Sequence, residues 1–546
     1  MPENKDNIPA AKGSRRTRRT RRRRGWPAVM AGTATLALAV AVVGAGTLFP
    51  GANATTQTKP VPHLLPVGEA LANCQGPTQL LAGSAAGTDP DFSANSSSTR
   101  TQLNAVVLSG TAGDLPGSAV QSLNGKFSPL FTVAQAPAGP AATPTELTGK
   151  PKLRAALVRQ KSADGPSVLR VQPLGEENPQ ASGSVVVDAG DGDLAGLAAA
   201  TCQTPSNELW LSGASTTVGR TAILAISNSS ASPATISLEL FGQGGPVQSA
   251  GGRGLVVAAG AVRSVVLSGL APDEEMLSVH LKSSGAAVSA VIQQSVLRGL
   301  TPGGIDYLAP VQAPASTLAI PGVRVQAPDA AARISGQSGY DDATTILAVT
   351  VPGVADSMVE VKAYGPDGQV ALPNGGVFTA AAGKVSQLPL AGLPQGTYSL
   401  SINADAAVAA TVRIVNSTKA GDAVDLAFAP SAGRLGDTHL VTLPQDTSST
   451  LVFTAPEGAS TLSLVPISAD GVPGAGKDVA LRAGTTKTLD PAAFLGSGTA
   501  AVLISVSGAP TYGTQLLGKP GSAGIAVLPI AGTAAGTHSI NITTSY

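Results

Sequence analysis

The chain has 546 residues, of which 43% are hydrophobic, 13% charged and 3% aromatic, and its mean hydropathy is +0.20. A disordered chain would be less hydrophobic and more highly charged, and the 64 Gly and 41 Pro, with no heptad pattern, exclude a coiled coil. The formal net charge of +1 combines +8 in residues 1–25 with −7 in the remainder. The length allows roughly three to five domains.

Residues 1–25 form a basic tail that carries eight Arg between Arg15 and Arg24. Such a tail is typical of a nucleic-acid-binding arm or of the cytoplasmic flank of a membrane span. Residues 26–49 favour the membrane, because they contain no charged side chain and would reach about 36 Å as a helix, more than the ~30 Å hydrocarbon layer. We predict a single-pass cell-membrane protein with a cytoplasmic N-terminus, an extracellular ectodomain and no nucleic-acid partner.

The apolar stretch over residues 26–49 is longer than the core of a typical signal peptide, which favours an uncleaved signal anchor. Cleavage after Ala54 stays open, because Ala52-Asn53-Ala54 matches the pattern that signal peptidase cuts. Residues 50–63, rich in Pro, Thr and Ala, are interpreted as a linker. With or without cleavage, the rest of the chain is exported.

Cys74 and Cys202 are the only cysteines, and both lie on the exported side. An even number of cysteines in an oxidising compartment predicts a disulfide, and two buried free thiols are the alternative. The bridge would close a separation of 128 residues, for which the loop-entropy model gives about 4–5 kcal/mol.

Beyond the linker, apolar and polar residues alternate with period two in short segments separated by Gly, Pro, Asp and Asn, as in 236–240, 359–364 and 398–403. This pattern is typical of strands with one buried face. Similar segments recur in the same order at offsets of about 120 and then about 100 residues. The predicted domains are a divergent β domain over 64–206, repeat 1 over 207–315, repeat 2 over 316–435 and repeat 3 over 436–546.

Repeats of about 100–120 residues with some seven short strands have the size of an immunoglobulin-like sandwich. A propeller blade of about 40–50 residues is shorter. The sequence therefore predicts an all-β ectodomain of tandem immunoglobulin-like β-sandwich repeats after one N-terminal transmembrane helix. A closed assembly stays open, because residues 538–544 resemble the strand that opens each repeat.

The chain contains no Gly-x-Ser-x-Gly, no phosphate-binding Gly-x-x-x-x-Gly-Lys-[Ser/Thr] and no His-Glu-x-x-His, so we predict no catalytic, cofactor-binding or metal-binding residues. Trp210 is interpreted as a core residue of the strand that opens repeat 1. Four scattered His are interpreted as solvated surface residues: His63, His280, His439 and His538.

Asp188, Asp191 and Asp193 form the one acidic cluster whose spacing suits a cation. Intervening Gly residues permit a tight turn of oxygen ligands, but the order of an EF-hand calcium loop and its terminal Glu are missing. A solvated turn and a cation site are therefore both left open, and the turn is favoured.

The ectodomain resembles an uncharacterised family of actinobacterial membrane-anchored envelope proteins, rich in Ala, Gly and Pro and of unknown function. The resemblance rests on the Arg-rich tail with one span, on Trp210-Leu211-Ser212-Gly213 and on the segment 302–307, Pro-Gly-Gly-Ile-Asp-Tyr. It covers mainly residues 15–310. It implies a location and an architecture, and it brings no catalytic residues.

We predict a non-enzymatic cell-envelope protein whose anchored ectodomain acts as a spacer or as a module that interacts with protein or cell-wall partners. Strand edges and end loops would bind the partner, and the net negative charge suits a basic one. The alternative is an exported hydrolase that cleaves cell-wall polymers through two carboxylates about 5–10 Å apart in the divergent domain. Its candidate residues are Asp89, Asp91, Glu176, Glu177, Asp188, Asp191 and Asp193.

Overall fold

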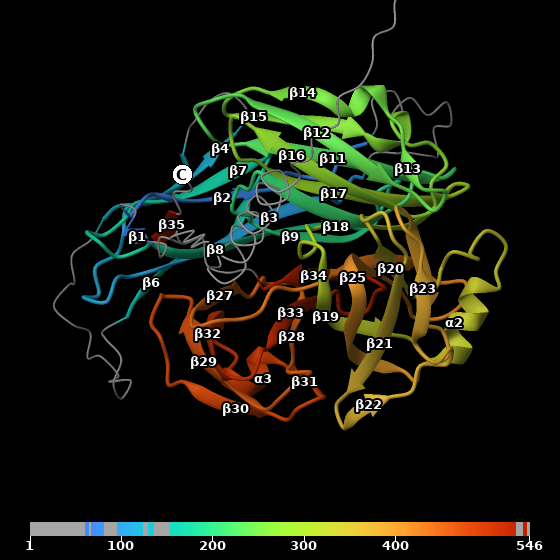
Figure 1. The fold of residues 1–546 in the computed structure, drawn as a ribbon. Coiled ribbons are helices and arrows are strands. Elements are labelled where there is room, and N and C mark those ends of the chain that lie inside the picture. The colour runs from blue at the N-terminus through green and yellow to red at the C-terminus, as the bar shows by residue number, and fades with distance from the viewer. Residues whose placement is uncertain are drawn as a thin grey trace, which may run out of the picture. The chain divides into compact units, whose positions relative to one another are not determined.

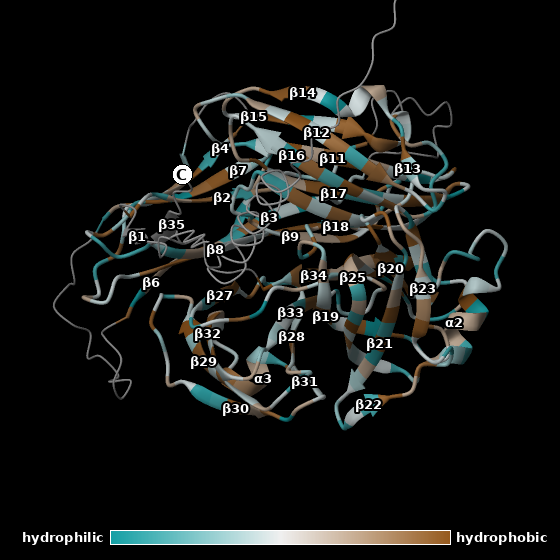
Figure 2. Ribbon diagram, in the orientation of Figure 1, coloured by the Kyte–Doolittle hydropathy of each residue, from teal (hydrophilic) through white to brown (hydrophobic). Residues whose placement is uncertain are grey.

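The structure is a computed structural model, and it describes residues 61–64, 67–80, 96–123, 129–135, 153–530 and 539–542. Strands make up most of these residues, as the sequence predicts, and Figure 2 shows hydrophobic segments along many of them. None of the helices in the described ranges is long and apolar enough to cross a membrane. The predicted span over 26–49 and the basic tail lie outside the described residues.

The divergent domain contains two antiparallel four-stranded sheets. We call the sheet with the first strand of a domain its opening sheet and the sheet with the last strand its closing sheet. The opening sheet has the order β2 (Ala70–Cys74), β7 (Ser167–Val171), β4 (Ser118–Ser122) and β5 (Pro129–Val133). The closing sheet has the order β6 (Ala155–Ser162), β3 (Arg100–Leu108), β8 (Gln180–Ala189) and β9 (Gly196–Thr201).

Repeat 1 has the same plan, with two short 3₁₀ helices at Ala250–Gly252 and Leu267–Gly269. Its opening sheet contains β10 (Glu208–Ala214), β16 (Leu277–Ser284), β12 (Ala234–Phe241) and β13 (Pro246–Val247), and β14 (Arg253–Val257) also pairs with β12. Its closing sheet contains β15 (Ala261–Val266), β11 (Arg220–Asn228), β17 (Ser289–Arg298) and β18 (Thr301–Leu308).

In repeat 2, one long strand, β25 (Gly396–Ser417), contributes its first half to the opening sheet and its second half to the closing sheet. The other opening strands are β19 (Ala315–Val325), β21 (Ser357–Gly365), β22 (Gly368–Val370) and β23 (Val377–Ala380). The other closing strands are β24 (Val385–Pro389), β20 (Ile346–Thr350) and β26 (Val424–Pro430). Helix α2 (Pro328–Ser335) lies between β19 and β20.

Repeat 3 completes the series. Its helix α3 (Pro491–Leu495) follows β31 (Thr486–Leu489) and precedes β32 (Thr499–Gly508) in the chain. The opening sheet contains β27 (His439–Thr442), β32 (Thr499–Gly508), β29 (Ser460–Ser468) and β30 (Lys477–Leu481). The closing sheet contains β31 (Thr486–Leu489), β28 (Ser448–Thr454), β33 (Tyr512–Gly518) and β34 (Ile525–Pro529). The Asp490 carboxylate caps α3 by accepting hydrogen bonds from the amides of Ala492 and Ala493, at 2.9 and 3.2 Å.

The strand order is shared by the four domains. The first strand of each domain pairs with the opening-sheet strand that comes last in the sequence, which is β7, β16, β25 or β32. The second strand of each domain lies in the closing sheet. In a constant-type immunoglobulin domain, the first two strands pair within one sheet. The described domains are thus two-sheet sandwiches whose strand order differs from that arrangement.

Apolar side chains join each opening sheet to the closing sheet of the next domain. Trp210 and Phe241 of repeat 1 pack on Ile346 and Ala348 of repeat 2, and comparable clusters join the divergent domain to repeat 1 and repeat 2 to repeat 3. The series also closes, because Leu440 and Leu503 of repeat 3 share a cluster with Val106 and Leu108 of the divergent domain. Each closing sheet is therefore covered on both faces.

The last strands of the four domains meet. Strand β18 packs against β9 and β26, and β34 packs against the same two strands. Figure 1 shows β9, β18 and β34 near the middle of the four domains. This mutual packing explains why β26 is buried along its whole length and why its sequence is almost continuously apolar. The closed assembly that the sequence left open is thus present, and the last strands of the four domains meet within it.

Two predicted boundaries differ from the structure. Strand β1 (Val61–Leu64) lies partly in the expected linker and pairs antiparallel with β35 (Ser539–Ile542), which we had placed in repeat 3. These strands belong to one compact unit, Met1–Leu64 with Ser539–Tyr546, and the four sandwiches belong to the other, Leu65–His538. The period-two pattern predicted a strand in the segment that contains Ser539–Ile542, but a pattern of this kind does not identify the pairing partner.

Candidate functional site

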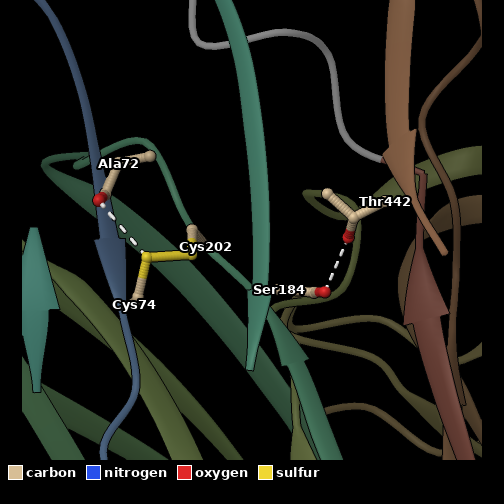
Figure 3. Close-up of a disulfide and its surroundings, with 5 residues drawn as sticks. All are labelled: Ala72, Cys74, Ser184, Cys202 and Thr442. Atoms are coloured by element: carbon tan, nitrogen blue, oxygen red, sulfur yellow. Dashed lines mark hydrogen bonds between the residues drawn. A yellow bond between two sulfur atoms is a disulfide. The ribbon is translucent and has the colours of Figure 1, made fainter. Parts of the chain in front are cut away.

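Cys74 and Cys202 form the predicted disulfide (Figure 3). Cys74 is the last residue of β2 in the opening sheet, and Cys202 directly follows β9 in the closing sheet. The bridge therefore joins the first and last strands of the divergent domain across its two sheets. Both residues are buried in the core of this domain, where they have a structural role.

Two aspartates of the Asp188–Asp193 turn contact different partners and do not converge on one point. Asp188 forms an ion pair with Lys519 of repeat 3, at 2.6 Å, and Asp191 accepts hydrogen bonds from the hydroxyls of Ser96, Ser97 and Ser98. These bonds, that of Ser96 first, hold the pKa of Asp191 well below its usual range. Burial raises the pKa of Asp193. No three His, Cys, Asp or Glu side chains of the described residues are grouped as metal ligands, and the Asp188–Asp193 turn is not such a group.

Two of the four His are buried, which corrects their interpretation as solvated residues. His280 is 5% exposed and stacks on Trp210, with ring centroids 4.0 Å apart, and its two ring nitrogens contact Glu208 and Glu239 at 2.7 and 2.8 Å. The alternating pattern placed His280 on the polar face of its strand, but that face is covered by repeat 2. The Nε2 atom of His439 accepts a hydrogen bond from the Gly436 amide at 2.7 Å. His538 and the side chain of His63 lie outside the description.

Two buried carboxylates lie where the last strands meet. Asp425 on β26 accepts amide hydrogen bonds from Leu197, Ile305, Leu426 and Ile525, at 2.9–3.1 Å, so that it contacts strands of the other three domains. Gly196 and Gly304 make room for it, since a Cβ atom at either position would lie within 2.7 Å of its Oδ1 atom. Asp425 therefore links the four domains through hydrogen bonds to their backbones.

Asp306 on β18 is the second carboxylate and accepts hydrogen bonds from the amides of Phe428 and Ala199, at 3.0 and 3.3 Å. Burial raises the pKa of Asp425 to about 7, against the opposing effect of its amide donors. Burial also raises the pKa of Asp306, and the charge of Asp425 adds to this increase. All these partners are backbone amides, so both carboxylates are fixed as structural acceptors.

Repeat 2 carries an insertion that the neighbouring repeats lack. Its first and second strands are connected by residues 326–345, whereas the same connection covers only 215–219 in repeat 1 and 443–447 in repeat 3. Pro at the first position, Asp329 in the first turn and Arg333 in the last turn favour helix α2 within this insertion. Ile334 is the buried residue of the helix and packs with Val415 and Val424.

A cavity of about 450 Å³ lies between this insertion and the end of the repeat 2 sandwich. Its lining is mostly small and apolar and comes from α2, the end of β19, the loop before β25 and Val415. This volume is within the range of small-molecule sites in proteins. Insertions in repeat proteins map to loops on one face, which is often the binding face, so the cavity is our candidate functional site.

Three arginines contact Asp342, a residue of the insertion. The Oδ1 atom of Asp342 lies 2.6 Å from Nη1 of Arg298, and its Oδ2 atom accepts a hydrogen bond from Nε of Arg220 at 3.1 Å. Arg413 on β25 instead donates to the backbone carbonyl of Asp342, at 2.8 Å. The Arg298 guanidinium also lies 4.6 Å from the ring centroid of Tyr340. We call Arg220, Arg298 and Arg413 the arginine cluster.

Burial alone would raise the pKa of Asp342, but the hydrogen bond from Arg220 and the charges of Arg298 and Arg220 hold it below the ordinary value. Burial lowers the pKa of Arg413, against the opposing charge of Asp342. The cluster lies at the junction of repeats 1 and 2, and Val415 borders both it and the larger cavity.

Sequence reasoning missed these groups. Asp425 lies between Val424 and Leu426, and a lone charge inside such an apolar strand was the available signal that it is buried with partners. The arginine cluster had no comparable signal, because its members are up to about 190 residues apart in the sequence and meet only through the contact of two repeats. Three of the carboxylates proposed for a hydrolase contact separate partners: Glu177 accepts from Thr111, Asp188 pairs with Lys519 and Asp191 accepts from Ser98.

The chain thus belongs to the class of all-β proteins built from two-sheet sandwiches in a closed series. A family model described as "Family of unknown function (DUF5719)" matches residues 157–492, and the chain belongs to this family. The match covers repeats 1 and 2, including the α2 insertion and the arginine cluster, and parts of the two flanking domains. A search of curated proteins found no match.

Proposed function

We propose that the protein is a non-enzymatic cell-envelope module that binds a protein or cell-wall partner outside the membrane. The observation that carries the proposal is the closure of the four sandwiches around Asp425 and the last strands. Closure makes a rigid body whose outer strands and end loops stay available for a partner. It supports an interaction module more than a spacer, because four domains in an open row would span a greater length.

The α2 insertion is the part of this body that we assign to the partner. Loops on a rigid scaffold commonly carry binding residues, and this insertion borders the 450 Å³ cavity. Only Ile334 of α2 is buried, so the helix presents most of its surface outward. We further propose that the sandwiches are variants of the immunoglobulin-like architecture, which is shared by proteins of differing strand topology.

We also propose that residues 26–49 anchor the module in the cell membrane, with the basic tail in the cytoplasm, as in the actinobacterial envelope proteins that the sequence resembles. Protease added to intact spheroplasts should then digest the ectodomain and leave a short N-terminal fragment. Protection of the C-terminus from the protease would contradict this topology.

A photo-crosslinking amino acid at Ser338, an exposed residue of the insertion, tests the binding role in living cells. The expected product is one defined envelope adduct, which is lost when the same group is placed at exposed Lys487 of repeat 3. Purified protein should release no fragments from cell-wall polymers. Fragment release that disappears in Glu176→Gln or Glu177→Gln would favour the hydrolase alternative and refute the proposal.

A further inference from the structure

The arginine cluster has more positive charge than its surroundings neutralise. Arg298 and Arg413 are buried, with the Arg298 side chain 5% exposed and Arg413 7% exposed. Guanidinium groups stay protonated in proteins. Asp342 and the more distant, exposed Glu275 are the carboxylates whose charges act on Arg413. The Asp342 carboxylate forms ion pairs with Arg220 and Arg298, whereas Arg413 contacts only its backbone carbonyl. The buried charge of Arg413 thus has no ion-pair partner among the described residues, which is costly without a counterion.

Two donors of the cluster are also unused. The Nε atoms of Arg298 and Arg413 are buried and have no hydrogen-bond partner among the described residues. Both arginines line a cavity of about 20 Å³, together with Arg220 and Asp342. This space is enough for one or two water molecules or for one halide ion, but it is too small for a phosphate or sulfate group.

We propose that this cavity at the junction of repeats 1 and 2 binds one halide-sized monovalent anion, which is chloride in physiological salt. The anion accepts hydrogen bonds from the free Nε groups and neutralises the excess charge. Asp342 positions Arg220 and Arg298 around it, while the carbonyl of Asp342 holds Arg413. The anion joins the two repeats, and this role is independent of the proposed partner-binding function.

Thermal unfolding of the full chain in detergent, in sodium chloride or in sodium gluconate at equal ionic strength, tests the site. Gluconate is too large for the cavity, and equal ionic strength removes general screening from the comparison. The melting temperature should be about 1–2 °C higher in chloride. Arg413→Met should abolish the difference, whereas Arg263→Met, at an exposed arginine of β15, should retain it.

Diffraction from bromide-soaked crystals of the unmodified protein gives a second readout, which does not depend on whether Arg413→Met folds. The expected result is an anomalous peak in the cavity, within hydrogen-bonding distance of Arg298 and Arg413. Equal melting temperatures in the two salts and an empty or water-filled cavity would overturn the proposal. A chloride effect that persists unchanged in Arg413→Met would also overturn it, because the anion would then bind elsewhere.

Discussion

At the scale of single residues, Asp425 links the four domains, because its two oxygens accept four backbone amides, one from each domain. Asp425→Asn keeps the shape but turns an amide NH₂ group toward amides that need an acceptor. We expect the free energy of unfolding to fall by about 2–4 kcal/mol, measured by urea denaturation. Exposed Asp437→Asn is the control and should change it by less than about 0.5 kcal/mol.

The raised pKa of Asp425 predicts a pH dependence of stability. The folded state keeps the proton up to about pH 7, while the unfolded chain loses it near pH 4, so the folded state binds more protons between these values. Stability from this group is therefore present below pH 4 and is lost as the pH rises to about 7. Asp306 acts in the same direction. Urea denaturation between pH 5 and 8 should show that Asp425→Asn destabilises more at pH 5, and an equal effect at both pH values would contradict this.

At the scale of single elements, the disulfide joins β2 to the end of β9. Replacing both cysteines, in Cys74→Ser/Cys202→Ser, should lower the free energy of unfolding by about 4 kcal/mol. The bridge joins residues that are 128 positions apart, and its loss increases the conformational entropy of the unfolded chain. The reduced natural protein is an internal control and should match the double variant, because the chain has no other cysteine. Free thiols at both positions in a non-reduced digest would contradict the bridge.

Helix α2 is held mainly by Ile334, which is 0% exposed. Ile334→Ala should therefore release the insertion locally, because its small apolar cluster contains few other large side chains. Hydrogen exchange should become faster over residues 328–345 and stay slow in β20. The neighbouring exposed Arg333→Ala should leave both rates unchanged, and accelerated exchange throughout repeat 2 would show that the insertion is not an independent element.

At the scale of the whole molecule, the sequence predicted the all-β class and the disulfide, because period-two patterns and cysteine pairing are local or compositional signals. It left a closed assembly open, and it did not predict that each opening sheet packs on the closing sheet of the next domain. The repeats looked too long for propeller blades, and no local signal shows that an opening sheet will pack on the next domain. His280 illustrates the consequence: its strand face is polar in isolation, but the facing repeat buries it.

The closed series of four sandwiches is the central claim, and small-angle X-ray scattering of the compact unit Leu65–His538 tests it most directly. A compact body of this length should have a radius of gyration of about 23 Å. Four sandwiches in an open row would instead exceed roughly 40 Å, given about 13 Å for a single domain of 100 residues. A value near 23 Å is the result we predict, and a value above 40 Å would contradict the closure of the series.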